Sequence, residues 1–155
     1  MFTCLFVCVP FASGEEWREF RGYTTGGRLP ANSALPTSWS PEQGVKWRTE
    51  IPGEGWSSPV VADGRIYLTT AIQNEQKGYD LCLITVDSTS GAVLGQRKVF
   101  EQPADAPNIH KKNSHASPTP LLSGKSLYLH FGHQGTACVD RNSGEILWKN
   151  DSLEY

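Results

Sequence analysis

Hydrophobic positions along this chain gather in short runs separated by Gly, Asp, Asn and Ser, and two series of runs resemble each other. One series begins WSSPVVADGRIYL (residues 56–68) and the other begins HASPTPLLSGKSLYL (residues 115–129). Several runs lack strict alternation of apolar and polar residues, which is typical of strands covered on both faces. No run repeats its apolar positions every 3.6 residues. The pattern therefore predicts strands and almost no helix.

Each series contains four apolar runs. An Asp-Gly or Ser-Gly pair separates the first run from the second, and such a Gly supplies the positive φ that a two-residue hairpin turn needs. The third run ends in an aspartate and the fourth follows a glycine: Asp87 and Gly91 in the first series, Asp140 and Gly144 in the second. Four short strands in a period of about 50 residues predict the blades of a β-propeller.

A further apolar run precedes the first series. The segment VKWRTEI (residues 45–51) matches ILWKNDS (residues 146–152), with Trp47 aligned to Trp148 and a basic residue after each. We therefore expect residues 45–51 to be a fourth strand without its own first three, as when an N-terminal strand closes a propeller ring. The predicted fold is all-β, a partial β-propeller of about two four-stranded antiparallel blades plus one orphan closing strand. Its predicted parts are an irregular arm (15–44) and a propeller region (45–155). The propeller region contains the orphan strand (45–51) and two blades (56–99 and 116–152).

The N-terminus carries an apolar run of ten residues, Phe2 to Phe11, followed by the small residues Ala12, Ser13 and Gly14. Ten residues are too few to cross about 30 Å of hydrocarbon as a helix, so we expect no membrane span. An apolar run followed by small residues is typical of a signal peptide, so we predict one at 1–14 and a secreted or periplasmic protein. No Lys or Arg precedes the run, which leaves the true start codon open. The alternative is a buried N-terminal strand.

Length, net charge and cysteine positions limit the classes of protein to which this chain can belong. A chain of 155 residues normally forms one domain with a core. Net charge is −2 with acids and bases interspersed and no block of like charge, so we expect no nucleic-acid partner and no anionic membrane surface as a partner. Cys82 and Cys138 lie in apolar runs. We interpret them as small buried hydrophobic residues, with a disulfide as the alternative.

The segments VDSTSGAVLG (residues 86–95) and VDRNSGEILW (residues 139–148) resemble the repeat of pyrroloquinoline-quinone-type (PQQ) β-propellers. From Trp17 to Trp148 the chain is similar to secreted bacterial PQQ-binding-like propeller proteins. The aspartate of this repeat can accept backbone N–H bonds from the following turn, the glycine takes a positive φ, and the tryptophan would cover the junction with a neighbouring blade. We interpret five residues as this structural signature: Asp87, Gly91, Asp140, Gly144 and Trp148. The first copy departs from the repeat, because Gly95 stands where the tryptophan belongs.

The resemblance implies two functions. One is a noncatalytic protein- or ligand-binding scaffold, of which a BamB-like role in outer-membrane protein assembly is one version. The other is a fragment of a PQQ-dependent quinoprotein dehydrogenase, a class that holds its quinone over calcium with Glu, Asn and Asp. No such set can be placed in this sequence, and there is no adjacent Cys pair. We expect no catalytic residues and no cofactor, with PQQ and calcium as the alternative.

Candidate contact residues come from the segments that precede the first strand of each blade. Four histidines lie close together at 110, 115, 130 and 133, but no carboxylate pattern or Cys pair accompanies them, so we predict no metal site. In a closed ring the strand entrances would face the central funnel. We therefore predict ligand contacts at Trp56, Ser57, Ser58, Asn113, Ser114 and His115.

Two blades and a lone strand leave apolar faces uncovered, because a blade buries its faces only against its neighbours. We therefore expect either an N-terminal fragment of a longer propeller or self-association that covers these faces. The partner is expected to be a protein or a small ligand. A complete small β-sandwich is a third alternative and would make the repeat coincidental.

Overall fold

The computed structural model of the chain describes the backbone of residues 2–7 and all of residues 16–22, 26–29, 33, 36–107 and 109–152. Within these ranges there is no α-helix, one short 3-10 turn, η1 (Gly132–Gln134), and a series of β-strands. None of the helical structure described is long and apolar enough to cross a membrane. The first four-stranded sheet contains β3 (Val60–Ala62), β4 (Arg65–Gln73), β5 (Tyr79–Asp87) and β6 (Val93–Gln102). The second contains β7 (Leu121–Ser123), β8 (Ser126–His130), β9 (Thr136–Asp140) and β10 (Ile146–Asn150).

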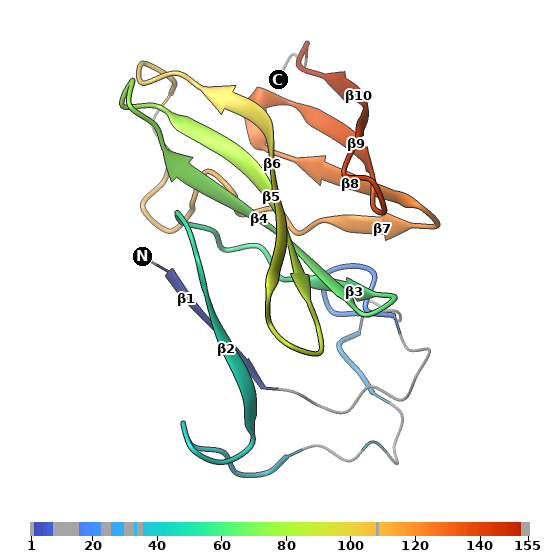
Figure 1. Ribbon diagram of the computed structural model, residues 1–155. Helices are drawn as coiled ribbons and strands as arrows, with labels where there is room; N and C mark the ends of the chain where they lie inside the picture. Colours follow the sequence, from blue (N-terminus) through green and yellow to red (C-terminus); the bar gives the residue numbers. More distant parts are fainter. Residues whose placement is uncertain are drawn as a thin grey trace.

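Both sheets are antiparallel meanders, in the orders β3-β4-β5-β6 and β10-β9-β8-β7, so each strand pairs with its neighbours in sequence (Figure 1). The hairpin turns use the glycines that the sequence places there, with φ of 73° at Gly64 and 57° at Gly124. The predicted all-β class is confirmed. The two sheets lie side by side as blades of a partial β-propeller (Figure 1).

A separate two-stranded sheet lies on the other side of the first sheet (Figure 1). Its strand β2 (Val45–Ile51) joins neither four-stranded sheet and pairs antiparallel with β1 (Phe2–Val7), in a register that sets Phe2 opposite Ile51. Residues 2–7 of the N-terminal apolar run thus form a strand here, and the rest of the run lies outside the described residues. The signal peptide stays a prediction, and its expected cleavage edge lies outside the described residues.

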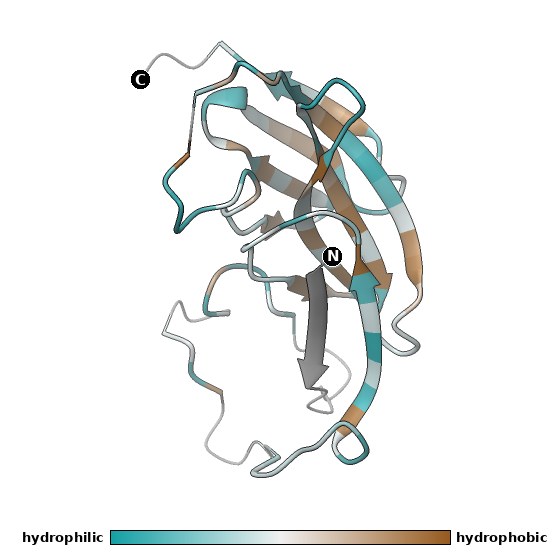
Figure 2. Cartoon of the chain, turned by 90° about the vertical axis from the view of Figure 1, so that its left-hand side faces the viewer, coloured by the Kyte–Doolittle hydropathy of each residue, from teal (hydrophilic) through white to brown (hydrophobic). Residues whose placement is uncertain are grey.

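The largest core lies between the two four-stranded sheets. It includes Tyr67 and Leu81 from the first sheet and Leu127, Leu129 and Val139 from the second, all at most 1% exposed. Hydropathy colouring shows hydrophobic positions concentrated along these strands, while loops are mostly hydrophilic (Figure 2). Each such buried side chain contributes about 1.5–3 kcal/mol, so this interface holds the two sheets together.

A second core covers the opposite face of the first sheet. Ile66 and Leu68 of β4 and Ile84 and Val86 of β5 pack with Ile51 at the end of β2. Neighbouring residues of β4 and β5 therefore point into different cores, because side chains alternate between the faces of a strand. This explains why the apolar runs of the first series lack alternation.

The two described cysteines are buried and free. Cys82 is 0% and Cys138 2% exposed, and no disulfide joins them. Burial raises the pKa of the Cys82 thiol to about 11, so it stays protonated and unreactive near neutral pH.

Candidate functional site

The segments that precede β3 and β7 run side by side. The backbone N–H groups of Trp56 and Ser57 both donate to the carbonyl of Ala116, at 3.1 and 3.2 Å. The N–H of Ser58 donates to Thr119 Oγ1 at 3.0 Å. The structure thus brings three of the six predicted contact residues against the equivalent segment of the other blade.

Hydroxyl groups fix both segments. Ser57 Oγ accepts a bond from the Thr69 N–H at 3.1 Å, which fastens the first segment to β4. In the second segment Ser114 is only 8% exposed, and its Oγ accepts from the Ala116 N–H at 3.2 Å. Ser117 Oγ donates to the Ser114 carbonyl at 3.0 Å. Ser114 therefore shapes the loop and offers little surface to a ligand.

The other two predicted residues, Asn113 and His115, lie on either side of Ser114. His115 packs its ring against Tyr79, with centroids 4.4 Å apart, and burial lowers the pKa of its imidazole. Asn113 is exposed, and its N–H donates to the His110 carbonyl at 2.8 Å within a turn. His115 is therefore a neutral ring at neutral pH, packed on the first blade.

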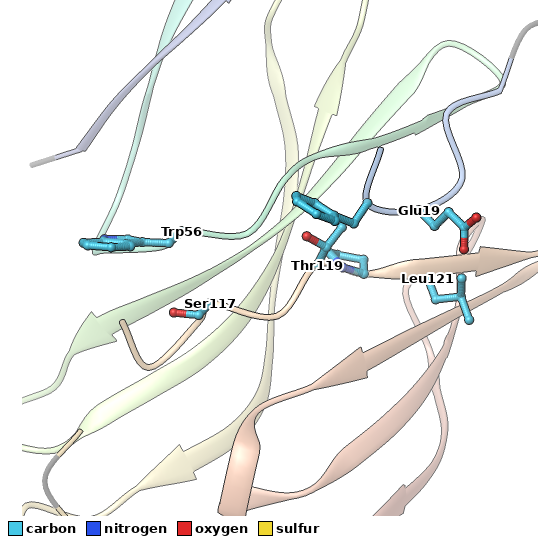
Figure 3. Close-up of a pocket in the computed structure, with 7 residues that line it drawn as sticks. Glu19, Trp56, Ser117, Thr119 and Leu121 are labelled. Carbon is cyan, nitrogen blue, oxygen red and sulfur yellow. The ribbon is translucent and has the colours of Figure 1, made fainter. Parts of the chain in front are cut away.

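A cleft of about 450 Å³ opens beside these segments, and we call it the Trp56 cleft. The Trp56 and Phe20 side chains are 56% and 57% exposed at its edge. Figure 3 shows Trp56 on one side of Ser117 and Thr119, and Glu19 and Leu121 on the other. The cleft is lined by Glu19, Phe20, Trp56, Ser117, Thr119, Pro120 and Leu121.

Of the residues that line this cleft, only Trp56 is among the contact residues predicted from the sequence. Glu19 and Phe20 belong to the N-terminal arm, which docks through a β-bridge between Trp17 and Val61 and a bond from the Leu122 N–H to the Arg18 carbonyl. The arm has no strand or helix periodicity, so no pattern could place it. In the two series, Ser117-Pro118 aligns with Ser58-Pro59, and this match was the one signal in the sequence that pointed to Ser117.

The Trp56 cleft suits binding by contact and hydrogen bonding. Its aromatic and aliphatic side chains offer apolar surface, and Glu19, Ser117 and Thr119 offer polar groups. Across the described residues, no group of three or more His, Cys, Asp or Glu side chains could hold a metal ion.

The repeat signature residues form two matching turns. Asp87 Oδ1 accepts the N–H groups of Thr89 and Ser90 at 3.0 and 2.7 Å. In the second blade, Asp140 Oδ1 accepts those of Asn142 and Ser143 at 2.9 and 2.8 Å. These backbone hydrogen bonds hold the pKa of both carboxyl groups below the usual range. Each turn closes on a glycine with positive φ, 77° at Gly91 and 71° at Gly144.

The tryptophan position differs between the blades. Trp47 of β2 lies against the Asp87–Gly91 turn, where its Nε1 donates to the Ser88 carbonyl at 3.1 Å. We call this contact the first junction, and the contact of β6 with the Asp140–Gly144 turn the second junction. The second junction has no such ring, because Gly95 occupies the equivalent position of β6. Trp148 of β10 is 45% exposed, with its ring centroid 6.2 Å from that of Tyr128.

Neither the family models nor the curated proteins include a match to this sequence. Among solved structures, the fold is similar to a europium-containing methanol dehydrogenase, with 17% identity, a TM-score of 0.48 and 69% of this chain covered. It is also similar to BamB from Moraxella catarrhalis, with 20% identity, a TM-score of 0.41 and again 69% covered. This chain spans 19% and 31% of the lengths of those two proteins.

Proposed function

We propose that this chain is a noncatalytic, protein-binding β-propeller scaffold that acts in the periplasm or outside the cell, and that its partner docks at the Trp56 cleft. The observation that carries the proposal is the pair of exposed aromatic rings, Trp56 and Phe20, at the edge of a concave site. Buried aromatic anchors supply much of the binding energy in protein interfaces. The location follows from the predicted signal peptide.

The chemistry of the lining supports binding over catalysis. The Ser117 hydroxyl is bonded to the Ser114 carbonyl, and no histidine is among the residues that line the cleft. Thr119 Oγ1 already accepts the Ser58 N–H. A nucleophile needs an adjacent base within hydrogen-bond reach, and no hydrogen bond joins either hydroxyl to Glu19, the carboxylate of this lining. The cleft therefore offers contact surface without an activated group.

Site-specific photocrosslinking tests the proposal in cells that express the chain. A benzophenone amino acid replaces Trp56, and the matched control carries it at Trp39, which is also 56% exposed but lies outside the cleft. We expect a covalent adduct with one protein of defined mass at position 56 and none at position 39. Adding Phe20→Ala should reduce the adduct, because that substitution removes half of the aromatic edge. Equal adducts at both positions, or none at position 56, would contradict the proposal.

A further inference from the structure

The two junctions differ by one aromatic ring. At the first junction the Trp47 indole lies so close to Gly91 that a Cβ added there would come within 2.5 Å of the ring. Thr49, two residues further along β2, donates its hydroxyl to the Gly91 carbonyl at 2.5 Å. The Trp47 ring and the two hydrogen bonds from Trp47 and Thr49 therefore hold β2 against the Asp87–Gly91 turn.

At the second junction, arginine side chains make the contacts to the turn that Trp47 and Thr49 make at the first. Arg97, two residues after Gly95, takes the role of Thr49, and its Nε donates to the Gly144 carbonyl at 3.0 Å. Arg65 reaches in from β4, and its guanidinium donates to the carbonyls of Arg141 and Asn142 at 3.4 and 3.3 Å. The Arg141 carbonyl is the counterpart of the Ser88 carbonyl that Trp47 contacts.

At the second junction, no ring fills the space that corresponds to the one the Trp47 indole occupies at the first. Apart from the glycine itself and its two neighbours in the chain, no atom of the described residues lies within 4 Å of where a Cβ would stand on Gly95 or on Gly144. A cleft of about 390 Å³ occupies this space, and we call it the Gly95 cleft. Its lining includes Arg65, Leu83, Thr85, Gly95, Arg97 and Gly144.

The lining of the Gly95 cleft combines apolar surface with positive charge. Leu94 of β6, which is 53% exposed, contributes apolar surface, and Arg65 and Arg97 contribute positive charge. Both arginines donate to backbone carbonyls, and neither forms an ion pair with a carboxylate of the described residues. Arginine stacks on aromatic rings and binds carboxylates through its planar fork. A volume of this size is at the lower end of the range for small-molecule sites.

We propose that the Gly95 cleft binds a small aromatic carboxylate. The ring would lie over Gly144 as the Trp47 indole lies over Gly91, and the carboxylate would pair with Arg97 and Arg65. This site shares no lining residue with the Trp56 cleft, so it stands apart from the proposed protein-binding role.

Isothermal titration calorimetry of the full chain with indole-3-acetate tests the proposal. Indole-3-ethanol, which has the same ring system and no charge, is the matched ligand. We expect one site per chain and an affinity for the acetate about tenfold or more above that for the alcohol, because only the acetate forms charge-assisted bonds to arginine. Arg97→Gln should weaken acetate binding about tenfold. Trp39→Ala, at an exposed ring that lines neither cleft, should leave it unchanged.

Gly95→Trp places the chain's own indole in the cleft and should abolish binding of the acetate. Its thermal unfolding should occur at or above the wild-type temperature, which would show that the cleft is filled and the fold intact. Binding retained by folded Gly95→Trp, equal affinity for the alcohol, or no heat of binding to the wild type would overturn the proposal. If Gly95→Trp fails to fold, the Arg97→Gln titration decides: undiminished binding there would likewise overturn it.

Discussion

The two four-stranded sheets share one sequence pattern but differ in how many of their faces are covered. In the first sheet, Leu81 points toward the second sheet and Ile84 toward β2, and both are 0% exposed. In the second sheet, Leu127 and Leu129 are equally buried, yet Leu147 of β10 is 53% exposed. The repeat therefore determines which residues face the neighbouring blade, whereas burial of the other face depends on the presence of a further element.

Truncation of one enclosed side chain of the first sheet and of one exposed side chain of the second sheet should show the difference most strongly. Ile84→Ala removes a side chain enclosed between the first sheet and β2, and we expect it to lower the free energy of unfolding by about 3 kcal/mol. Leu147→Ala removes a half-exposed side chain and should cost less than about 1 kcal/mol. Urea denaturation followed by circular dichroism measures both.

Leu81→Ala is the control for this pair, because Leu81 lies in the core between the two sheets. It should cost about as much as Ile84→Ala. If Ile84→Ala were as mild as Leu147→Ala while Leu81→Ala stayed severe, β2 would not cover the first sheet as described.

The junctions provide a second comparison with a smaller expected effect. Gly91→Ala and Gly144→Ala both place a Cβ at a positive φ, which costs about 1–2 kcal/mol. At Gly91 the new Cβ also meets the Trp47 ring, whereas at Gly144 the space is open. We expect Gly91→Ala to cost about 1–3 kcal/mol more than Gly144→Ala in urea denaturation, because of this overlap.

A double variant isolates the cause of that difference. In a Trp47→Ala background the ring is gone and the contact of the added Cβ with Thr49 Oγ1, at 2.8 Å, remains, so the further cost of Gly91→Ala should fall toward that of Gly144→Ala. An undiminished cost in this background would mean that the Trp47 contact does not distinguish the two junctions.

Local turn chemistry is the part of this fold that the sequence predicts best. The Asp-Gly pair at Asp63-Gly64 marks a hairpin, and the match of Trp47 to Trp148 places a strand at β2, because both signals need only a few neighbouring residues. The docking of Phe20 beside Trp56 and the stacking of His115 on Tyr79 join segments with no shared periodicity. Such contacts depend on how the chain packs at long range, so the Trp56 cleft could be predicted only in part.

The smallest expected effect is a change of stability with pH, and it concerns the aspartate turns, which are alike in the two blades. Asp87 and Asp140 each accept two backbone N–H bonds and one serine hydroxyl, and these bonds lower the pKa of both carboxyl groups. Since the folded pKa is below the unfolded one, each carboxylate stabilises the fold above the unfolded pKa of about 4. That stabilisation is lost as the pH falls through the folded pKa. We therefore expect the urea midpoint of the wild type to fall below about pH 4.

Asp87→Asn and Asp140→Asn test whether the two turns contribute equally to this acid sensitivity. Asparagine keeps an acceptor oxygen but does not titrate, so each variant should be less stable than the wild type at pH 7 and should approach it as the pH falls toward about 2. Because the contacts match, the two differences from the wild type should follow the same pH curve. A pH-dependent difference in only one variant would show that the repeats, alike in geometry, differ in the electrostatics of their turns.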